Sequence, residues 1–432
     1  MVQVNMKEEF FHHLWKYCLF DRKDLKTSSG EILIIDKPGE HNSNAGPDFF
    51  NAKLRIDDTL WVGNVEVHIN SSDWYLHKHQ IDKAYDNVVL HVVFNHDQQV
   101  KRSSGEIIPT LELKGKFDSA LIFKFDKLLH SSLWIPCQEN IKQTNTFIID
   151  AWMERLFFER LERKTHEIQN ELQKNKNNWQ ETFYFFLARS FGFKINAEPF
   201  ELLAKSLPLS YLLKHKESLF QIQALLFGQA GLLEKEFNDA FPIALKKEYH
   251  FLKKKYNLQP LDLHLWKFLR LRPVNFPTLR IALFSKLIHQ CGNLFSNMIN
   301  TSCLEELYAI FNVSADEYWD SHYVFDKASI KLPKSLGKAF CENILINTII
   351  PFLFLYGKTK DEASFQETAI KLMEKIPGEK NSIILKWEQL SMKTQTAFQT
   401  QALLELKKQY CTEKKCLNCS IGINMLKTVI HD

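Results

Sequence analysis

The sequence predicts an α+β protein in which an α/β domain with a mixed sheet is followed by a large all-helical domain. Up to about residue 125, short apolar runs separated by turn residues are typical of strands, and six of the 14 glycines lie within the first 115 residues. From about residue 147 onward, apolar residues recur at helical spacing. We therefore expect one domain at residues 1–125 and a second at residues 126–432.

The first domain is expected to open with a helix and to continue with a sheet. Apolar residues at helical spacing predict the helix over residues 7–20. The run over 88–94 is apolar on both faces, which is typical of a central strand covered on both sides. Strands are expected over 31–36, 49–56, 60–69, 88–94 and 107–113, with a loop and a helix over 74–85.

Amphipathic patterns predict the helices of the second domain. The clearest covers residues 147–174, where apolar positions are interleaved with oppositely charged pairs that stabilise an exposed helix face. Prolines lie near most of the expected breaks. Further helices are expected over 179–191, 218–233, 244–256, 278–290, 336–355 and 396–410.

Composition and charge argue against a membrane protein and give only weak support for a nucleic-acid partner. Hydrophobic residues make up 45% and charged residues 25% of the chain, as in soluble globular proteins. The net charge of +4 is far from the strongly basic balance of dedicated nucleic-acid-binding proteins. The N-terminus lacks the uninterrupted apolar core of a secretory signal, and the longest apolar run, over 344–356, is too short to span a bilayer. A cytoplasmic location and no membrane partner are expected.

Residues 40–95 hold the polar pattern that predicts a functional site. Residues i and i+2 of a strand point to the same face, so Glu66 and His68 project together, while Asp48 lies where the preceding strand begins. Their face is polar throughout and alternates with apolar residues that point to the core. Carboxylates placed in this way predict a site for a divalent cation, with Asp48 and Glu66 as ligands.

Other polar residues near this site leave several roles open. His77 and His79 could ligate a metal or contact a phosphate, and a histidine-rich surface loop is the other interpretation. His91 lies inside an apolar strand, where a buried histidine usually bonds to a neighbour. Glu8 or Glu9 of the first helix could reach the metal, although a solvated helix face is the simpler expectation.

The cysteines form the second candidate metal site. Eight cysteines in a cytosolic chain should be reduced, so a cluster among them favours metal binding over disulfides. Cys411, Cys416 and Cys419 include the CxxC spacing of a metal knuckle, and Cys137 is the best candidate for a fourth ligand, with His431 as an alternative. The sequence does not separate Zn²⁺ from a [4Fe–4S] cluster, and incidental cysteines are the remaining interpretation.

The order of elements, with Pro47-Asp48 at a strand start and Glu66-x-His68 on the next strand, resembles the core of the PD-(D/E)xK nuclease superfamily. The resemblance covers about the first 120 residues. It implies that Asp48 and Glu66 hold one or two Mg²⁺ ions and that a lysine positions or activates the attacking water. His68 occupies the position of that lysine, and a neutral imidazole can accept a proton but carries no permanent charge.

Several segments spread over the chain carry a second resemblance, namely 44–49, 64–68, 71–74, 77–79, 90–93, 227–231, 272–277 and the terminal cysteines. On these segments, and over nearly its full length, the chain is identified as a member of an uncharacterised bacterial family, domain of unknown function 2851. The family has no established activity, so this resemblance implies none.

Together these features predict a Mg²⁺- or Mn²⁺-dependent phosphodiesterase acting on nucleic acid. Asp48 and Glu66 would bind the metal, and His68 would orient or deprotonate the water, so activity is expected to rise with pH between about 6 and 7. One alternative is a non-catalytic nucleic-acid-binding or assembly protein that kept the fold. The other is a transition-metal hydrolase whose ligands are His68, His77, His79 and His91.

Overall fold

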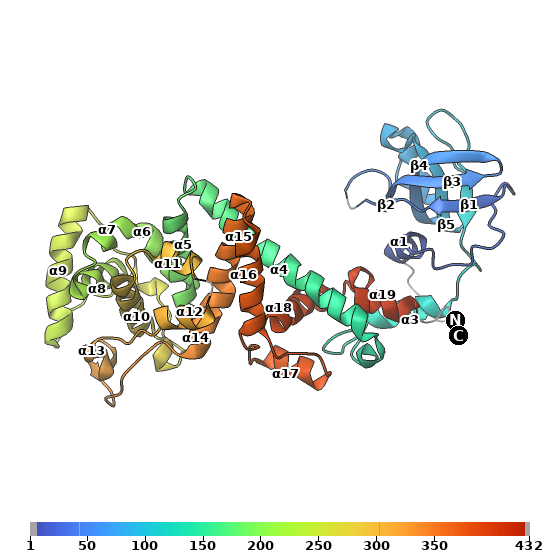
Figure 1. Ribbon diagram of the computed structural model, residues 1–432. Coiled ribbons are helices and arrows are strands. Elements are labelled where there is room, and N and C mark those ends of the chain that lie inside the picture. Colours follow the sequence, from blue (N-terminus) through green and yellow to red (C-terminus); the bar gives the residue numbers. More distant parts are fainter. Residues whose placement is uncertain (1–6, 43, 302, 428–432) are drawn as a thin grey trace. The chain divides into compact units, whose positions relative to one another are not determined.

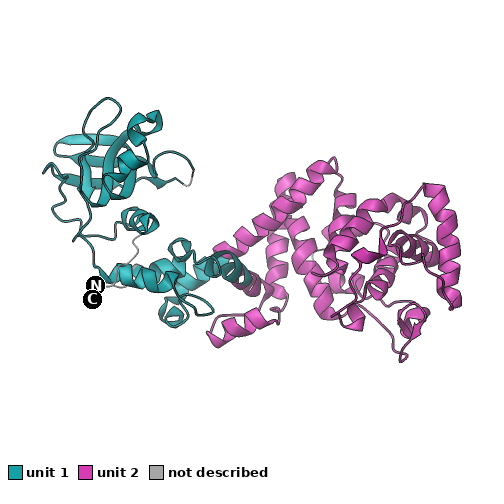
Figure 2. Ribbon diagram, turned by 180° about the vertical axis from the view of Figure 1, so that it is seen from behind, with its two compact units in different colours: residues 1–154, 404–432 teal, residues 155–403 magenta. Residues whose placement is uncertain are grey.

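The structure, a computed structural model, describes residues 7–42, 44–301 and 303–427 (Figure 1). The chain divides into two compact units, one formed by residues 1–154 with 404–432 and the other by residues 155–403 (Figure 2). The first unit contains a curled mixed sheet and the second is mainly helical. The predicted succession of an α/β part and a helical part is therefore confirmed.

A six-stranded mixed sheet lies at the centre of the first unit. Its strands are β1 (Leu33–Lys37), β2 (Glu40–His41), β3 (Phe49–Ile56), β4 (Thr59–Asn70), β5 (Val88–Asn95) and β6 (Thr110–Glu112). The order is β1-β3-β4-β5-β6, and β2 pairs with β3. The pairs among β1 to β4 are antiparallel, whereas β4–β5 and β5–β6 are parallel. A parallel pair needs a crossover connection, and the one between β4 and β5 carries most of the candidate site.

The main core of this unit lies between the sheet and helix α1 (Glu8–Lys16), which is shorter than the predicted helix. Phe11 and Trp15 of α1 are fully buried in one cluster with Val65 and Val67 of β4. Glu66 and His68 alternate with these valines and therefore project away from that cluster. The two-residue period thus separates the core of β4 from its functional face.

The crossover between β4 and β5 forms a second, smaller core. It consists of α2 (Asp73–Leu76) and two short 3₁₀ helices, His79–Ile81 and Lys83–Tyr85, where the sequence predicts a loop and one helix. Trp74 of α2 is fully buried in this core, against Val88 of β5.

The C-terminal residues return to the first unit. Helix α3 (Ala120–Leu129) and the last helix, α19 (Ser420–Lys427), both contribute to its main core, through Leu121 and Phe125 from α3 and Leu426 from α19. Residues separated by most of the chain are thereby packed together.

The second unit is built from helices and one short sheet. Its antiparallel strands β7 (His322–Val324) and β8 (Lys327–Ala328) show that the expectation of an all-helical domain is wrong at this point. The helices of 10 residues or more are α4 (Thr146–Lys174), which begins in the first unit, α5 (Trp179–Phe191), α6 (Ala197–Ser206), α8 (Leu219–Gln229), α9 (Ala240–Tyr256), α10 (Pro277–Gln290), α15 (Ile350–Lys360) and α16 (Ala363–Lys375). Shorter helices are α7 (Leu209–Lys214), α11 (Leu294–Ile299), α12 (Leu304–Ile310), α13 (Glu317–Asp320), α14 (Lys338–Ile344), α17 (Ser382–Gln389) and α18 (Ala397–Glu405), which ends in the first unit.

One helical stretch of the second unit is long and apolar enough to cross a bilayer. It runs over Lys338–Lys360 and includes α14, a π-helical turn and α15. Of its most apolar window, 72% is buried inside the protein, which is the burial of a core helix in a soluble protein.

Candidate metal centre

The loop before β3 positions Asp48. The side-chain amide of Asn42 donates hydrogen bonds to the carbonyl oxygens of Asn44 and Pro47, both at 3.0 Å, and thereby closes the loop on itself. Gly46 has a φ of +104°, a backbone conformation that residues with a Cβ rarely adopt. Just after Asp48, Asn51 has a φ of +55° at a shift in the β3–β4 register. Such bulges often lie beside functional sites, where they redirect side chains.

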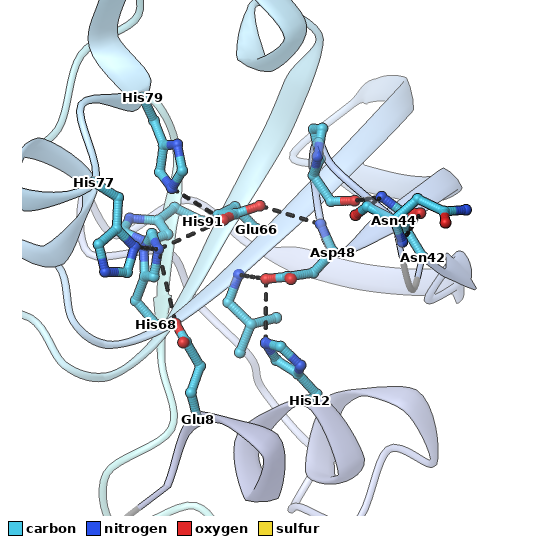
Figure 3. Close-up of polar contacts among 12 residues, drawn as sticks. Glu8, His12, Asn42, Asn44, Asp48, Glu66, His68, His77, His79 and His91 are labelled. Atoms are coloured by element: carbon cyan, nitrogen blue, oxygen red, sulfur yellow. Dashed lines mark hydrogen bonds and ion pairs between the residues drawn. The ribbon is translucent and has the colours of Figure 1, made fainter. Parts of the chain in front are cut away.

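Asp48 and Glu66 lie next to each other but face different partners (Figure 3). The N–H of Asp48 donates to Oε2 of Glu66 at 3.1 Å, and the N–H of Val67 donates to Oδ2 of Asp48 at 3.0 Å. His12 of α1 places its Nε2 3.2 Å from the same Oδ2. Asp48 is therefore held by the backbone and by His12, whereas Oε1 of Glu66 turns toward the histidines.

Three imidazoles converge beside Glu66 (Figure 3). The ligand atoms of His68, His77 and His79 all lie within 4.8 Å of one another. Nδ1 of His77 is 3.1 Å from Nε2 of His68. Oε1 of Glu66 is 3.3 Å from Nε2 of His79 and 3.5 Å from Nε2 of His68. Ligands about 2.1 Å from a tetrahedral ion are about 3.4 Å apart, so these contacts have the spacing of donors around one ion.

An unusual backbone conformation directs two of these rings. Lys78, between His77 and His79, has a φ of +63°, which is uncommon for a residue with a side chain. The rings of His77 and His79 both lie near that of His68, with centroid distances of 4.9 and 5.3 Å. Such conformations cost about 1–3 kcal/mol and tend to occur at functional sites.

Aromatic residues of the second core form one wall of the centre. The ring of Tyr85 stacks on His79 at a centroid distance of 3.8 Å. Trp74 contacts the rings of His79 and His91, at 5.3 and 5.5 Å. His68 and His91 are buried and His79 is only 9% exposed, whereas His77 is exposed. The centre is therefore enclosed on the sheet side and open to solvent at His77.

Burial disfavours the charged forms of the carboxylates Glu66 and Glu8. Burial, together with the charge of Asp48, raises the pKa of Glu66 to about 9. Burial also raises the pKa of Glu8, whose Oε1 lies 3.8 Å from Nε2 of His68. Nε2 of His79 is buried without a hydrogen-bond partner. A divalent cation among these atoms would satisfy both the carboxylates and the imidazole, so the residues present fit a metal ion.

Burial favours the neutral form of His68 and His79, which is the form that binds metals. Burial and the neighbouring histidines lower the pKa of His68 to about 2, and burial lowers the pKa of His79. A pKa this low does not favour His68 as the base behind the expected rise in activity between pH 6 and 7, so that role stays a prediction. The position of His68 suits a metal ligand.

His91 orients His68. It lies opposite Glu66 in the parallel β4–β5 pair, and its Nε2 is 2.8 Å from Nδ1 of His68. Burial lowers the pKa of His91 to about 3, so both rings are neutral. When Nδ1–H of His68 donates to His91, Nε2 of His68 presents its lone pair to the centre. His91 therefore positions a ligand and is not a ligand itself. This agrees with the expectation of a buried histidine that bonds to a neighbour.

Replacement of His91 by Phe is expected to weaken metal binding by about 10- to 100-fold, because it removes the acceptor that fixes the tautomer and the ring of His68. Calorimetric titration of the chelator-treated protein with Zn²⁺ and Mn²⁺ measures this. Thr110→Val is the matched control, since Thr110 is buried opposite His91 on β6 and its hydroxyl donates to the carbonyl of Ile108. Equal affinities for His91→Phe and the wild type would show that His91 has only a packing role.

The structure brings together most of the residues expected at this site and adds one. Glu66, His68, His77 and His79 form the centre, and Asp48 lies beside it. His12 was missed by sequence reasoning, although it follows Glu8 by one helical turn and the two could have been considered as a pair.

Comparison with known proteins gives a family but no activity. No curated protein matches the chain, and no solved structure does. One family model covers Glu66, His68, His77 and His79, which together are called the histidine centre, but it ends before the three C-terminal cysteines. Contrary to the expectation from the sequence, these cysteines therefore do not contribute to the family match. The chain belongs to the family described as protein of unknown function (DUF2851), whose model matches residues 8–382.

Proposed function

We propose that the chain is a metal-dependent phosphodiesterase acting on nucleic acid, with one metal ion held by Glu66, His68, His77 and His79. The observation that supports this is the convergence of three imidazoles with Oε1 of Glu66. Imidazole and carboxylate together suit Zn²⁺ or Mn²⁺, whereas Mg²⁺ takes mainly oxygen ligands. The proposal thus replaces a Mg²⁺ site on Asp48 and Glu66 with a histidine-rich centre.

The charge beside the centre supports an anionic substrate. A cavity of about 700 Å³ in the first unit is lined by His12, which contacts Asp48, and by several lysines. Two acidic residues, Glu9 and Glu413, also line it, but basic groups are in excess. A cavity lined in this way attracts polyanions such as a phosphodiester backbone. The basic lining residues are Lys7, His12, His13, Lys16, His41, His130, Lys414 and Lys415.

His12 would act on the substrate from α1. Burial lowers its pKa, but the hydrogen bond to Asp48 and the charges of Asp48 and Glu8 outweigh that effect, so its pKa is raised overall. An imidazolium at this position can bind a phosphate oxygen or protonate a leaving alkoxide. A bound divalent cation would polarise the phosphodiester and lower the pKa of water.

Two further features agree with this proposal. The sequence resemblance of the first 120 residues to PD-(D/E)xK nucleases supports the reaction class, with histidine at the position of the usual lysine. All eight cysteines are free, which favours a reducing compartment, and we propose a cytoplasmic location.

Metal analysis and cleavage assays on the full-length protein test the proposal. We expect Zn²⁺ or Mn²⁺ to be retained at the histidine centre and to support cleavage of DNA or RNA. His77 is exposed, so His77→Ala should fold normally while losing this metal and about 100-fold or more of the activity. His264→Ala, at an exposed histidine of the second unit, is the control.

Two results would count against the proposal in different ways. Unchanged metal content in His77→Ala would exclude the histidine centre as the metal site. A wild-type protein that retains the metal but cleaves neither single- nor double-stranded DNA or RNA would favour the non-catalytic binding protein instead.

A further inference from the structure

The last 30 residues bring three cysteines to the segment that follows α3. A π-helical stretch, Leu406–Cys411, ends at Cys411, and a 3₁₀ helix, Cys416–Asn418, begins at Cys416. Nζ of Lys407 donates to the carbonyl oxygen of Trp134 at 2.8 Å, which fixes the C-terminal segment beside residues 134–137. This placement brings Cys137 near cysteines that lie more than 270 residues later in the chain.

The four cysteines line one space. Cys137, Cys411, Cys416 and Cys419 line a single small cavity of the first unit, together with Tyr410 and Lys415. Cys416 and Cys419 are 8% and 6% exposed, and all four cysteines are free. Four free thiols around one cavity form the ligand set of a tetrathiolate metal site.

The turn between Cys416 and Cys419 is held by backbone hydrogen bonds. The N–H of Cys419 donates to the carbonyl oxygen of Cys416 at 3.3 Å, and the N–H of Ile423 donates to the carbonyl oxygen of Cys419 at 2.8 Å. Gly422 is needed for this turn, because a Cβ there would lie 2.4 Å from the carbonyl oxygen of Cys416.

We propose that Cys137, Cys411, Cys416 and Cys419 together bind a second metal as thiolates, and that this metal fastens the C-terminal segment to the first unit. Zn²⁺ and an iron–sulfur cluster share this thiolate chemistry. The other ligand considered from the sequence, His431, lies outside the described residues. This site is independent of the histidine centre, since the two have no ligand in common.

The test uses the full-length protein purified in parallel with and without oxygen. In the His77→Ala protein, which lacks the metal of the histidine centre, we expect either about one equivalent of zinc that survives gel filtration, or iron and sulfide with visible charge-transfer absorption. In the same His77→Ala background, Cys419→Ser and Cys137→Ser should each lower the retained metal at least tenfold and lower the melting temperature, because metal binding contributes to folding. Cys291→Ser, at a half-buried cysteine that does not line the cavity, is the matched control and should change neither.

A measurement on the wild type guards against variants that fail to fold. Reconstitution of the metal-depleted protein with Co²⁺ should give thiolate-to-cobalt charge-transfer absorption, and this absorption should persist in His77→Ala. Absence of that absorption, or absence of zinc and iron from both preparations, would overturn the proposal. Loss of nuclease activity in His77→Ala with the thiolate metal retained would separate this site from the proposed catalytic centre.

Discussion

Replacement of Glu66 by Gln is expected to abolish metal binding at the histidine centre and to stabilise the metal-free protein at alkaline pH. Burial raises the pKa of Glu66 from about 4.5 to about 9 in the folded chain. Because the folded pKa is the higher one, the contribution of this group to stability is fully present below pH 4.5. It is lost as the pH rises toward 9, by up to about 1.4 kcal/mol per pH unit. A glutamine stays neutral, so Glu66→Gln should lack this loss.

Urea denaturation in the presence of a chelator, at pH values from 5 to 9, measures the difference. The free energy of unfolding of the wild type should fall relative to that of Glu66→Gln as the pH rises, and Glu106→Gln, at an exposed glutamate paired with Arg102, should follow the wild type. With Mn²⁺ added, which thiolate ligands do not favour, only the wild type and the control should gain stability. Parallel pH curves for all three proteins would show that Glu66 is not protonated in the metal-free fold.

The part of the site that lies on regular strands could be predicted from the sequence. The two-residue period of β4 placed Glu66 and His68 on one face, and the apolar run of β5 marked His91 as buried. The position of Asp48 at the start of β3 followed from the turn residues before it. In each case the local pattern determines the direction of the side chain.

The rest depends on features that no local pattern specifies. The turn at Lys78 brings His77 and His79 toward His68, yet lysine carries no preference for a positive φ. The parallel pairing of β4 with β5 places His91 behind His68, and the packing of α1 on the sheet brings His12 to Asp48. Pairing register and helix packing arise from contacts between distant segments. The sequence therefore suggested the candidate ligands, but it did not show that Glu66, and not Asp48, contacts the imidazoles of the histidine centre.

Replacement of His68 tests whether this position is a metal ligand or the counterpart of a catalytic lysine. Nε2 of His68 lies 3.1 Å from Nδ1 of His77 and 3.5 Å from Oε1 of Glu66, so His68→Gln should remove a ligand and lower both metal affinity and turnover by about 100-fold or more. In His68→Lys, an ammonium group would lie where the metal ion binds and would pair with Glu66.

The metal-free His68→Lys variant should therefore resist denaturation at alkaline pH better than the wild type, yet bind no Zn²⁺ or Mn²⁺ at the histidine centre and cleave no nucleic acid. Calorimetric metal titrations and cleavage assays with Mg²⁺, Mn²⁺ and Zn²⁺ on both variants and the wild type decide the matter. Burial keeps His68 neutral between pH 6 and 7, so titration of His68 should not change the turnover of the wild type in that range. The pH profiles of the wild type and His68→Gln should therefore have the same shape there. Mg²⁺-dependent cleavage by His68→Lys would instead indicate that Asp48 and Glu66 hold the catalytic metal, with position 68 supplying a cation beside the phosphate.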